Sequence, residues 1–293
     1  MNVGVALPTM IAGVGRDDLL AWMRAVDDGP FSVLACGERI AYPNQEMMAV
    51  LAGAATVTER VAIEATVSVT PMHPAVHVAK QAATIDVLSG GRFVLGVGVG
   101  GRDEDYRALG AGYGRRHARL DEQVATIRRV WAGEPVVDGV PPVGPAPVRP
   151  GGPPVLAGVM GPRAIARAAR WADGLAGFDL GPDPAGVART FEAFRAAWGD
   201  AARPGAPFLQ TSFWFALGDD GPDRLREYAH RYLAVFGDEV ASAMARACRA
   251  SSTRAVRDAL SACEDAGADE VVLVATTADL DDLHRAADLV AGR

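Results

Sequence analysis

Cysteine is scarce in this sequence. Only Cys36, Cys248 and Cys263 occur among 293 residues, and they lie far apart in the chain. So few and so scattered thiols exclude a disulfide framework and a CxxC metal site. A cysteine in an apolar strand, such as Cys36, is more often a packing residue than a nucleophile. We therefore expect a protein of the reducing cytoplasm that is not a thiol enzyme.

Long apolar runs and clusters of basic residues are also missing. No run approaches the roughly 20 apolar residues that a membrane-spanning helix needs. The start, MNVGVALP, lacks the basic region and apolar stretch of a secretory signal. Lys80 is the only lysine among 29 basic residues, and the net charge is −7. The negative net charge and the lack of clustered basic residues argue against nucleic acid as a partner. We expect neither a membrane nor a nucleic-acid partner.

Apolar residues, in contrast, make up 49% of the 293 residues, which is enough for a large core. A chain of this length is one α/β barrel of about 250 residues or two ordinary domains. The order of strands and helices has to decide between the two.

The most informative stretch is residues 61–106. Val61–Val69 is an apolar, β-branched run of strand length. Pro74 suits the first turn of a helix, and Gly90–Gly91 can supply the left-handed turn that ends it. A second strand, Arg92–Val97, then runs into a glycine-rich loop. Two strands joined by a helix are expected to lie parallel, which places this loop at the carboxyl edge of the sheet, where ligands bind.

The same alternation of strand and helix continues along the chain. The strands that we expect are 3–7, 31–36, 61–69, 92–97, 155–157, 174–178, 208–217 and 270–275. Two extra helical segments, 223–236 and 239–249, precede the last of them. Residues 139–154 hold seven prolines and four glycines, an irregular connection whose alternative interpretation is an interdomain linker. Eight strand–helix units favour a single (β/α)8 TIM barrel domain over residues 1–293, with extra helices inserted between strands 7 and 8.

In such a barrel the active site forms at the carboxyl ends of the strands. That rule selects candidates from topology alone, whether their roles are functional or structural. For shaping the substrate pocket we single out Thr9, Met72 and Trp214. The full set comprises Pro8–Thr9, Glu38–Arg39, Ser68–Met72, Gly98–Asp105, Gly158–Arg163, Asp179 and the region of Trp214.

Two glycine-rich loops stand out in that set. Gly96, Gly98 and Gly101 satisfy GxGxxG, but the dinucleotide fingerprint belongs in the first βα turn and here three strands precede it. The physical feature remains, because small residues let backbone N–H groups approach a phosphate. The loop from Gly158 to Arg163 has the same character and adds a guanidinium. The two loops together suggest one phosphorylated ligand; the alternative is a tight turn without a ligand.

Charged side chains after the second strand are the best candidates for polar chemistry. These are Glu38 and Arg39, whose alternative role is a surface ion pair. His73 and His77 share a helix face at a spacing of four, which could suggest a metal. No carboxylate accompanies them as in HExxH, so we favour His73 as a cap or pocket wall, His77 on the outer surface, and no metal site.

Four segments resemble the luciferase-like monooxygenase superfamily over nearly the whole chain. They are TPMHPAVHVAKQAATIDVLSGGRFVLGVGVGGRDEDY at 70–106, RRHARLDEQVATIRRVWAGE at 115–134, GGPPVLAGVMGPRAIARAARWADG at 151–174 and GADEVVLV at 267–274. The pattern GERxAYP…GVGVGGRDxDY is similar to the actinobacterial group that uses the deazaflavin coenzyme F420. The resemblance implies a (β/α)8 barrel, usually dimeric, that binds FMN or F420 at its carboxyl face.

The resemblance also implies roles for particular residues. The ring of the coenzyme would rest on a bulged third strand, with a non-proline cis peptide near Val67–Ser68. Glu104 or Asp105 would contact the ribityl chain. The residues that would hold the coenzyme are Val67, Ser68, Val69, Gly98, Val99, Gly100, Gly101, Glu104, Asp105, Gly158, Val159, Met160, Gly161 and Arg163.

This chain departs from the family pattern at two points. Glu38–Arg39 stands where many relatives have Asp–His or Glu–His, which leaves Glu38 or a bound water as the proton relay. The phosphate segment reads Gly-Val-Met rather than Gly-Gly-Ser, so a hydroxyl contact is lost while backbone donors remain. We expect an oxidoreductase that transfers hydride between reduced F420 and a small organic substrate. The alternatives are an FMN-dependent monooxygenase with a flavin reductase partner and a flavin-binding barrel without turnover.

Overall fold

The computed structural model describes residues 1–293 and contains a closed barrel of eight strands. The strands follow one another around the barrel in chain order. Strands β3 to β6 pair in parallel with their neighbours, as do β7 with β8 and the last strand with the first. The predicted (β/α)8 TIM barrel is therefore confirmed. The strands are β1 (Asn2–Ala6), β2 (Val33–Cys36), β3 (Ala62–Ser68), β4 (Phe93–Gly98), β5 (Val155–Gly158), β6 (Gly174–Ala176), β7 (Phe208–Phe215) and β8 (Glu270–Ala275).

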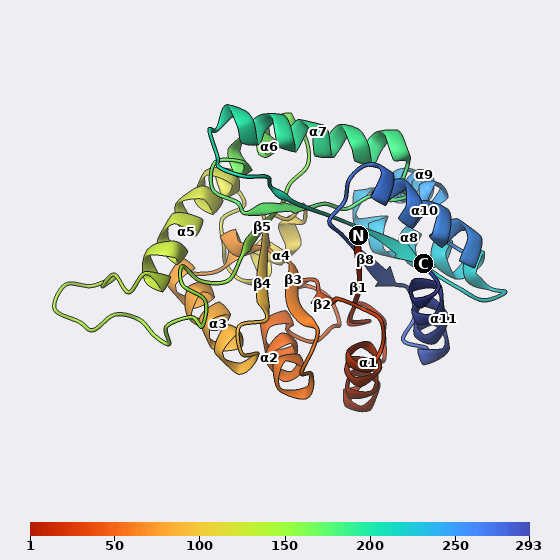
Figure 1. The fold of residues 1–293 in the computed structure, drawn as a ribbon, viewed down its shortest axis with the longest axis horizontal. Coiled ribbons are helices and arrows are strands. Elements are labelled where there is room, and N and C mark those ends of the chain that lie inside the picture. The colour runs from red at the N-terminus through yellow and green to blue at the C-terminus, as the bar shows by residue number, and fades with distance from the viewer. The chain divides into compact units, whose positions relative to one another are not determined.

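Helices connect the strands, and the extra ones lie where the sequence predicts them, between β7 and β8. Figure 1 shows the whole succession. The short helix α4, which follows β4 directly, was not expected from the sequence. The helices are α1 (Arg16–Asp28), α2 (Met47–Val57), α3 (Ala75–Leu88), α4 (Asp103–Ala108), α5 (Arg116–Trp131), α6 (Pro162–Ala168), α7 (Pro184–Asp200), α8 (Gly221–Leu233), α9 (Asp238–Ala247), α10 (Thr253–Asp265) and α11 (Leu280–Ala291), with 3-10 turns η1 (Thr70–Met72) and η2 (Ala234–Phe236).

By its internal contacts the chain divides into two compact units. One comprises residues 1–34, 177–193 and 209–293, and the other comprises 35–176 and 194–208. The proline-rich segment 139–154 lies wholly within the second unit, so it is not a linker between the two. In Figure 1 it runs out as a long loop between α5 and β5. Lys80 of α3 anchors it, because Nζ donates to the carbonyl of Gly144 at 2.8 Å. The prediction of a single domain over 1–293 stays a prediction.

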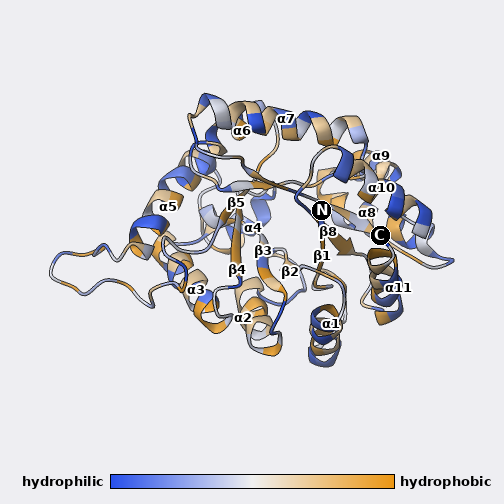
Figure 2. Ribbon diagram, viewed as in Figure 1, coloured by the Kyte–Doolittle hydropathy of each residue, from blue (hydrophilic) through white to orange (hydrophobic).

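Apolar side chains fill the strands and the inner stripe of each helix. On β4, Phe93, Leu95 and Val97 are fully buried, as expected for a strand covered by helices. An apolar stripe on α5, formed by Leu120, Val124, Ile127 and Trp131, is buried too. Figure 2 shows this pattern as orange strands beside helices of mixed colour. None of the helices combines the length and apolar character that crossing a membrane requires.

The segment Ser89–Arg92, between α3 and β4, links neighbouring elements through hydrogen bonds of Arg92, and we call it the Arg92 clamp. Gly90 and Gly91 take φ values of 64° and 87°, the left-handed turn predicted for them. The turn directs Arg92 toward the end of α2 and the start of β3. There its guanidinium donates to the carbonyls of Ala55, Thr58, Val61 and Ser89 and to the Thr58 hydroxyl, at 2.5–3.1 Å. These bonds tie α2, β3 and β4 together at the amino end of the barrel.

Candidate active site

The carboxyl end of β3 is irregular. Its pairing with β4 shifts register between Ala65 and Ser68, and the peptide bond between Thr66 and Val67 is cis. A bulge with a non-proline cis bond is what the family resemblance implies for this strand. The structure places the cis bond one residue before the expected Val67–Ser68.

The bulge directs the side chain of Val67 toward two glycines on the neighbouring strands. A Cβ at Gly98 would lie 2.8 Å from Val67 Cγ2, and a Cβ at Gly158 would lie 2.8 Å from Val67 Cγ1. Real Cβ atoms do not come so close, so both positions need glycine to accommodate the bulge. The packing of Val67 therefore explains why both positions are glycine, without reference to a ligand.

The two glycine-rich loops begin side by side. Gly98 of β4 is the register partner of Gly158 of β5, so both loops leave the same edge of the sheet from paired residues. The loop after β5 is open: Met160 is 83% exposed, and nothing lies within 4 Å of a Cβ at Gly161, where φ is 82°. Arg163 follows with an exposed guanidinium that makes no ion pair in the structure. An open backbone and a cation at the carboxyl edge are suited to an anionic ligand.

A buried tyrosine fixes the loop after β4. The hydroxyl of Tyr106 donates to the carbonyl of Val99 at 2.7 Å, and its ring meets Tyr113 edge to face. Burial raises the pKa of Tyr106 to about 12, against the lowering effect of Arg116 and Arg119. The hydroxyl is therefore a permanent donor at neutral pH. Gly100, with φ of 59°, packs against Val69 in the same loop.

Glu38, predicted as a catalytic residue, is buried and uses both carboxylate oxygens. Oε2 accepts from the backbone N–H of Val69 at 2.6 Å, and Oε1 lies 2.8 Å from Nε2 of His73. Burial lowers the pKa of His73, but the hydrogen bond and charge of Glu38, with a further contribution from Glu46, raise it above the usual value overall. The backbone of His73 is held as well, because Gln123 Nε2 donates to its carbonyl at 2.7 Å.

Arg39 takes part in a separate buried ion pair. Its Nε donates to Asp105 Oδ2 at 2.8 Å, while the other oxygen of Asp105 accepts from the N–H groups of Ile40 and Ala41 at 3.1 and 2.7 Å. Glu104 lies 3.6 Å from Arg39 and is more exposed than Asp105. Asp105 thus holds the loop after β2, and Glu104, with 31% of its side chain exposed, is the more accessible of the two acids. The alternative of a surface pair between Glu38 and Arg39 is wrong, because both are buried and bond elsewhere.

The partner of His73, a further candidate functional residue, was not found from the sequence. We expected a cap or pocket wall, and the structure pairs the imidazole with Glu38 at 2.8 Å. A signal existed: Glu38 follows β2 and His73 follows β3, and neighbouring parallel strands end at the same edge. Within the structure, no group of three or more His, Cys, Asp or Glu side chains is placed to hold a metal.

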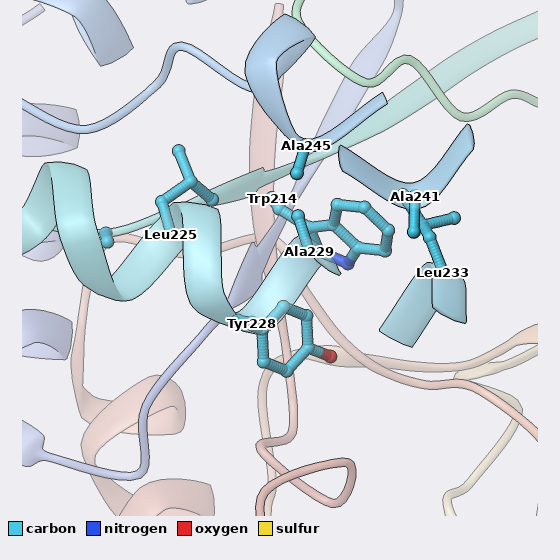
Figure 3. Close-up of a cluster of buried hydrophobic side chains, with 8 residues drawn as sticks. Trp214, Leu225, Tyr228, Ala229, Leu233, Ala241 and Ala245 are labelled. Carbon is cyan, nitrogen blue, oxygen red and sulfur yellow. The ribbon is translucent and has the colours of Figure 1, made fainter. Parts of the chain in front are cut away.

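The three residues predicted to shape a substrate pocket fall in different units. Met72 packs with Val69 and Tyr106, in the same unit as Glu38 and His73. Thr9 and Trp214 belong to the other unit, where both are buried. Figure 3 shows Trp214 in a cluster with Tyr228 and small residues of α8 and α9. Phe178 and Tyr232 meet the indole edge to face at 4.8 and 5.3 Å.

Comparisons with known proteins agree with this architecture. Pyrimidine monooxygenase RutA of Pantoea ananatis is 38% identical over 102 residues, which is 33% of this chain and 28% of that protein. The match thus spans little more than a quarter of that relative's length. Monooxygenase RslO1 from Streptomyces bottropensis superposes with a TM-score of 0.82 at 22% identity, covering 100% of this chain and 98% of its own. An F420-dependent secondary alcohol dehydrogenase in complex with an F420-acetone adduct superposes at 0.79 with 16% identity, covering 99% and 98%.

The two structural neighbours share less than a quarter of their residues with this chain, so they establish the fold alone. The family follows from a different match, because the model of luciferase-like monooxygenases fits residues 1–287 of the 293. The bulged β3, the paired glycine loops and the acidic residue after β2 lie where such a barrel has its carboxyl face. The chain belongs to the luciferase-like monooxygenase family.

Proposed function

We propose that this chain is an oxidoreductase that transfers hydride between reduced coenzyme F420 and a small organic substrate. The observation that carries the proposal is the pairing of Gly98 with Gly158, which starts two glycine-rich loops at one edge beside the bulged β3. The sequence pattern around Glu38 and Gly98–Tyr106 resembles the F420-using group, and a similar structure is an F420-dependent alcohol dehydrogenase.

The residues present fit such a coenzyme. The bulge between Ala65 and Ser68 offers a platform for the ring, and Glu104 offers a carboxylate for the hydroxyls of the ribityl chain. The loops 98–101 and 158–163 would hold the anionic tail through backbone N–H groups and Arg163. The coenzyme, when bound, supplies the hydride; the chain supplies position and a proton.

The test is a pair of fluorescence titrations of the purified chain, one with F420 and one with FMN. We expect tight binding of F420 and weaker binding of FMN. Arg163→Gln should weaken F420 binding about tenfold, because it removes a charge-assisted contact. Arg170→Gln is the matched control, since Arg170 is also exposed and follows the same helix. Equal affinities for F420 in both variants would remove Arg163 from the site.

A second function is favoured by the two relatives that are monooxygenases. Tight binding of FMN alone would support an FMN-dependent monooxygenase that receives reduced flavin from a reductase partner. Binding of neither coenzyme would contradict both functions and leave a barrel without turnover. We further propose that the enzyme is a homodimer of the cytoplasm, which light scattering and cell fractionation would test.

A further inference from the structure

We propose that His73 is the catalytic acid and base of this site, and that Glu38 is the residue that positions it. The inference rests on the proposed function, because it names the group that exchanges the proton of that reaction. It differs from the sequence-based expectation, in which Glu38 or a bound water relays the proton.

Accessibility distinguishes the two side chains. The side chain of Glu38 is 3% exposed and that of His73 is 22% exposed. Both oxygens of Glu38 already accept hydrogen bonds, one from Val69 N–H and one from the imidazole. A substrate can therefore meet the imidazole far more readily than the carboxylate.

The pairing also fixes which nitrogen is reactive. An ionised carboxylate only accepts hydrogen bonds, so Nε2 of His73 must carry the hydrogen that Oε1 of Glu38 receives. This leaves Nδ1 as the atom that gains and loses a proton, because the bond to Glu38 is made by Nε2. A carboxylate that fixes the tautomer of a histidine in this way is a recurrent arrangement in acid–base catalysis.

The surroundings favour the charged imidazole. Glu38 faces it from the loop after β2, and Glu46 acts on it from the N-cap of α2. On the side of α5, the guanidinium of Arg119 donates hydrogen bonds to the carbonyls of Pro71, Gly112 and Gly114. Gln123 of the same helix holds the carbonyl of His73. The hydrogen bond and charge of Glu38 and the charge of Glu46 raise the pKa of His73 above its usual value against the effect of burial, which favours the imidazolium that donates the proton.

The proton balance is simple. When hydride adds to the carbon of a polarised double bond in the substrate, a C–H bond forms and the electron pair of the broken π bond moves to the heteroatom. That atom takes the proton from Nδ1–H of the imidazolium, while the reduced coenzyme loses two electrons. Neutral His73 then keeps its Nε2–H on Glu38. In the opposite direction, Nδ1 accepts the proton from the substrate.

Nitrogen-15 NMR of the coenzyme-free chain tests the arrangement directly. The chain has five histidines, and His73→Asn identifies the relevant signal by its loss. We expect the Nε2–H tautomer and a pKa above the usual value of a histidine. In Glu38→Gln the side-chain carbonyl would accept from Val69 N–H, so the amide would donate to Nε2 and move the imidazole proton to Nδ1. An Nδ1–H tautomer in the wild-type chain would overturn the inference.

Kinetics with reduced F420 provides the second measurement. His73→Asn should lower turnover 10²- to 10⁴-fold and leave the Kd for F420 within about twofold, as expected for loss of a general acid. Glu38→Gln should shift the basic limb of the pH profile to lower pH, because His73 must be protonated to act as the acid and Glu38 raises its pKa. His77→Asn, on the exposed face of α3, is the control and should change neither. Absence of turnover in the wild-type chain would overturn the proposed function, whereas turnover retained by His73→Asn would overturn this inference alone.

Discussion

Arg39 and Asp105 form a buried ion pair whose atoms lie 2.8 Å apart although the two residues are 66 positions apart in the chain. The pair closes the loop after β2 onto α4, directly beside Glu38. Because Arg39 also lies over the ring of Tyr42, its side chain is held on two sides. The geometry makes Arg39 a positioning residue of the candidate site rather than a group free to react.

Removing the carboxylate of Asp105 should destabilise the protein strongly. Asp105→Ala removes the nearer carboxylate partner of the buried Arg39 guanidinium and the acceptor of two backbone N–H groups, a loss of about 3–5 kcal/mol in the free energy of unfolding. Asp103→Ala is the control, because Asp103 pairs with Arg107 on the exposed side of the same helix. That pair should contribute under about 0.5 kcal/mol. Urea unfolding compares the variants, and equal losses would contradict the role given to Asp105.

Loss of the Arg92 clamp should also destabilise the fold while leaving the candidate site intact. Arg92→Ala removes the donor for four carbonyls and one hydroxyl that lie at the amino end of the barrel. Buried carbonyls without donors cost about 1–3 kcal/mol each when unpaired, and water replaces part of that loss, so we expect about 3 kcal/mol. Coenzyme affinity well below the unfolding midpoint should be unchanged. A large loss of affinity with normal stability would contradict a purely structural role.

The architecture was predictable from sequence because each strand and helix carries its own local pattern. The run of β-branched residues at 61–69 and the stripe on α5 are periodic signals that tertiary contacts did not override. The juxtaposition of the two glycine loops was predictable for the same reason, since parallel neighbours end at one edge.

The pairing of Glu38 with His73 was not predictable in that way. It depends on the 3-10 turn at 70–72, which turns the imidazole back toward β2. The helix α4 was missed because its six residues are too short for a periodic signal. Likewise, glycine is needed at positions 98 and 158 because of the bulge at Val67. A bulge cannot be recognised from the residues of a single sequence.

The close packing of Val67 against Gly158 can be tested by a double-mutant cycle. Gly158→Ala places a Cβ 2.8 Å from Val67 Cγ1, so the bulge must move, and we expect weaker coenzyme binding by about tenfold together with lower stability. Adding Val67→Ala removes the clash, so the two changes should be less harmful together than the sum of each alone, by about 1–2 kcal/mol. Gly53→Ala, in open space on α2, is the control. Strictly additive losses would show that Val67 and Gly158 do not restrict each other.

The three thiols should be inert in the folded protein. Burial raises the pKa of Cys248 to about 11 and that of Cys263 to about 12, in both cases with a contribution from Asp179, and Cys36 is buried. A raised pKa keeps the thiol protonated, so at pH 8 well under about 1% of either residue is the reactive thiolate. Ellman's reagent should therefore react with the native chain more than about 100-fold more slowly than with the urea-unfolded chain. One thiol that reacts within seconds under native conditions would contradict this packing.

The contact between Glu38 and His73 should make stability depend on pH in a defined direction. The folded-state pKa of His73 lies above the value of 6.5 that an unfolded chain would have, so the folded state binds the proton more tightly. The resulting stabilisation is fully present below pH 6.5 and is lost as the pH rises through the folded-state pKa. Because other groups titrate as well, the quantity to follow is the difference in unfolding free energy between wild type and His73→Gln, from pH 5.5 to 8.5. That difference should fall as the pH rises, and it should be nearly flat when both chains carry Glu38→Gln, which lacks the negative charge. A difference that rises with pH would mean that burial outweighs the carboxylate and that His73 is held neutral, which would also leave the candidate site without its acid.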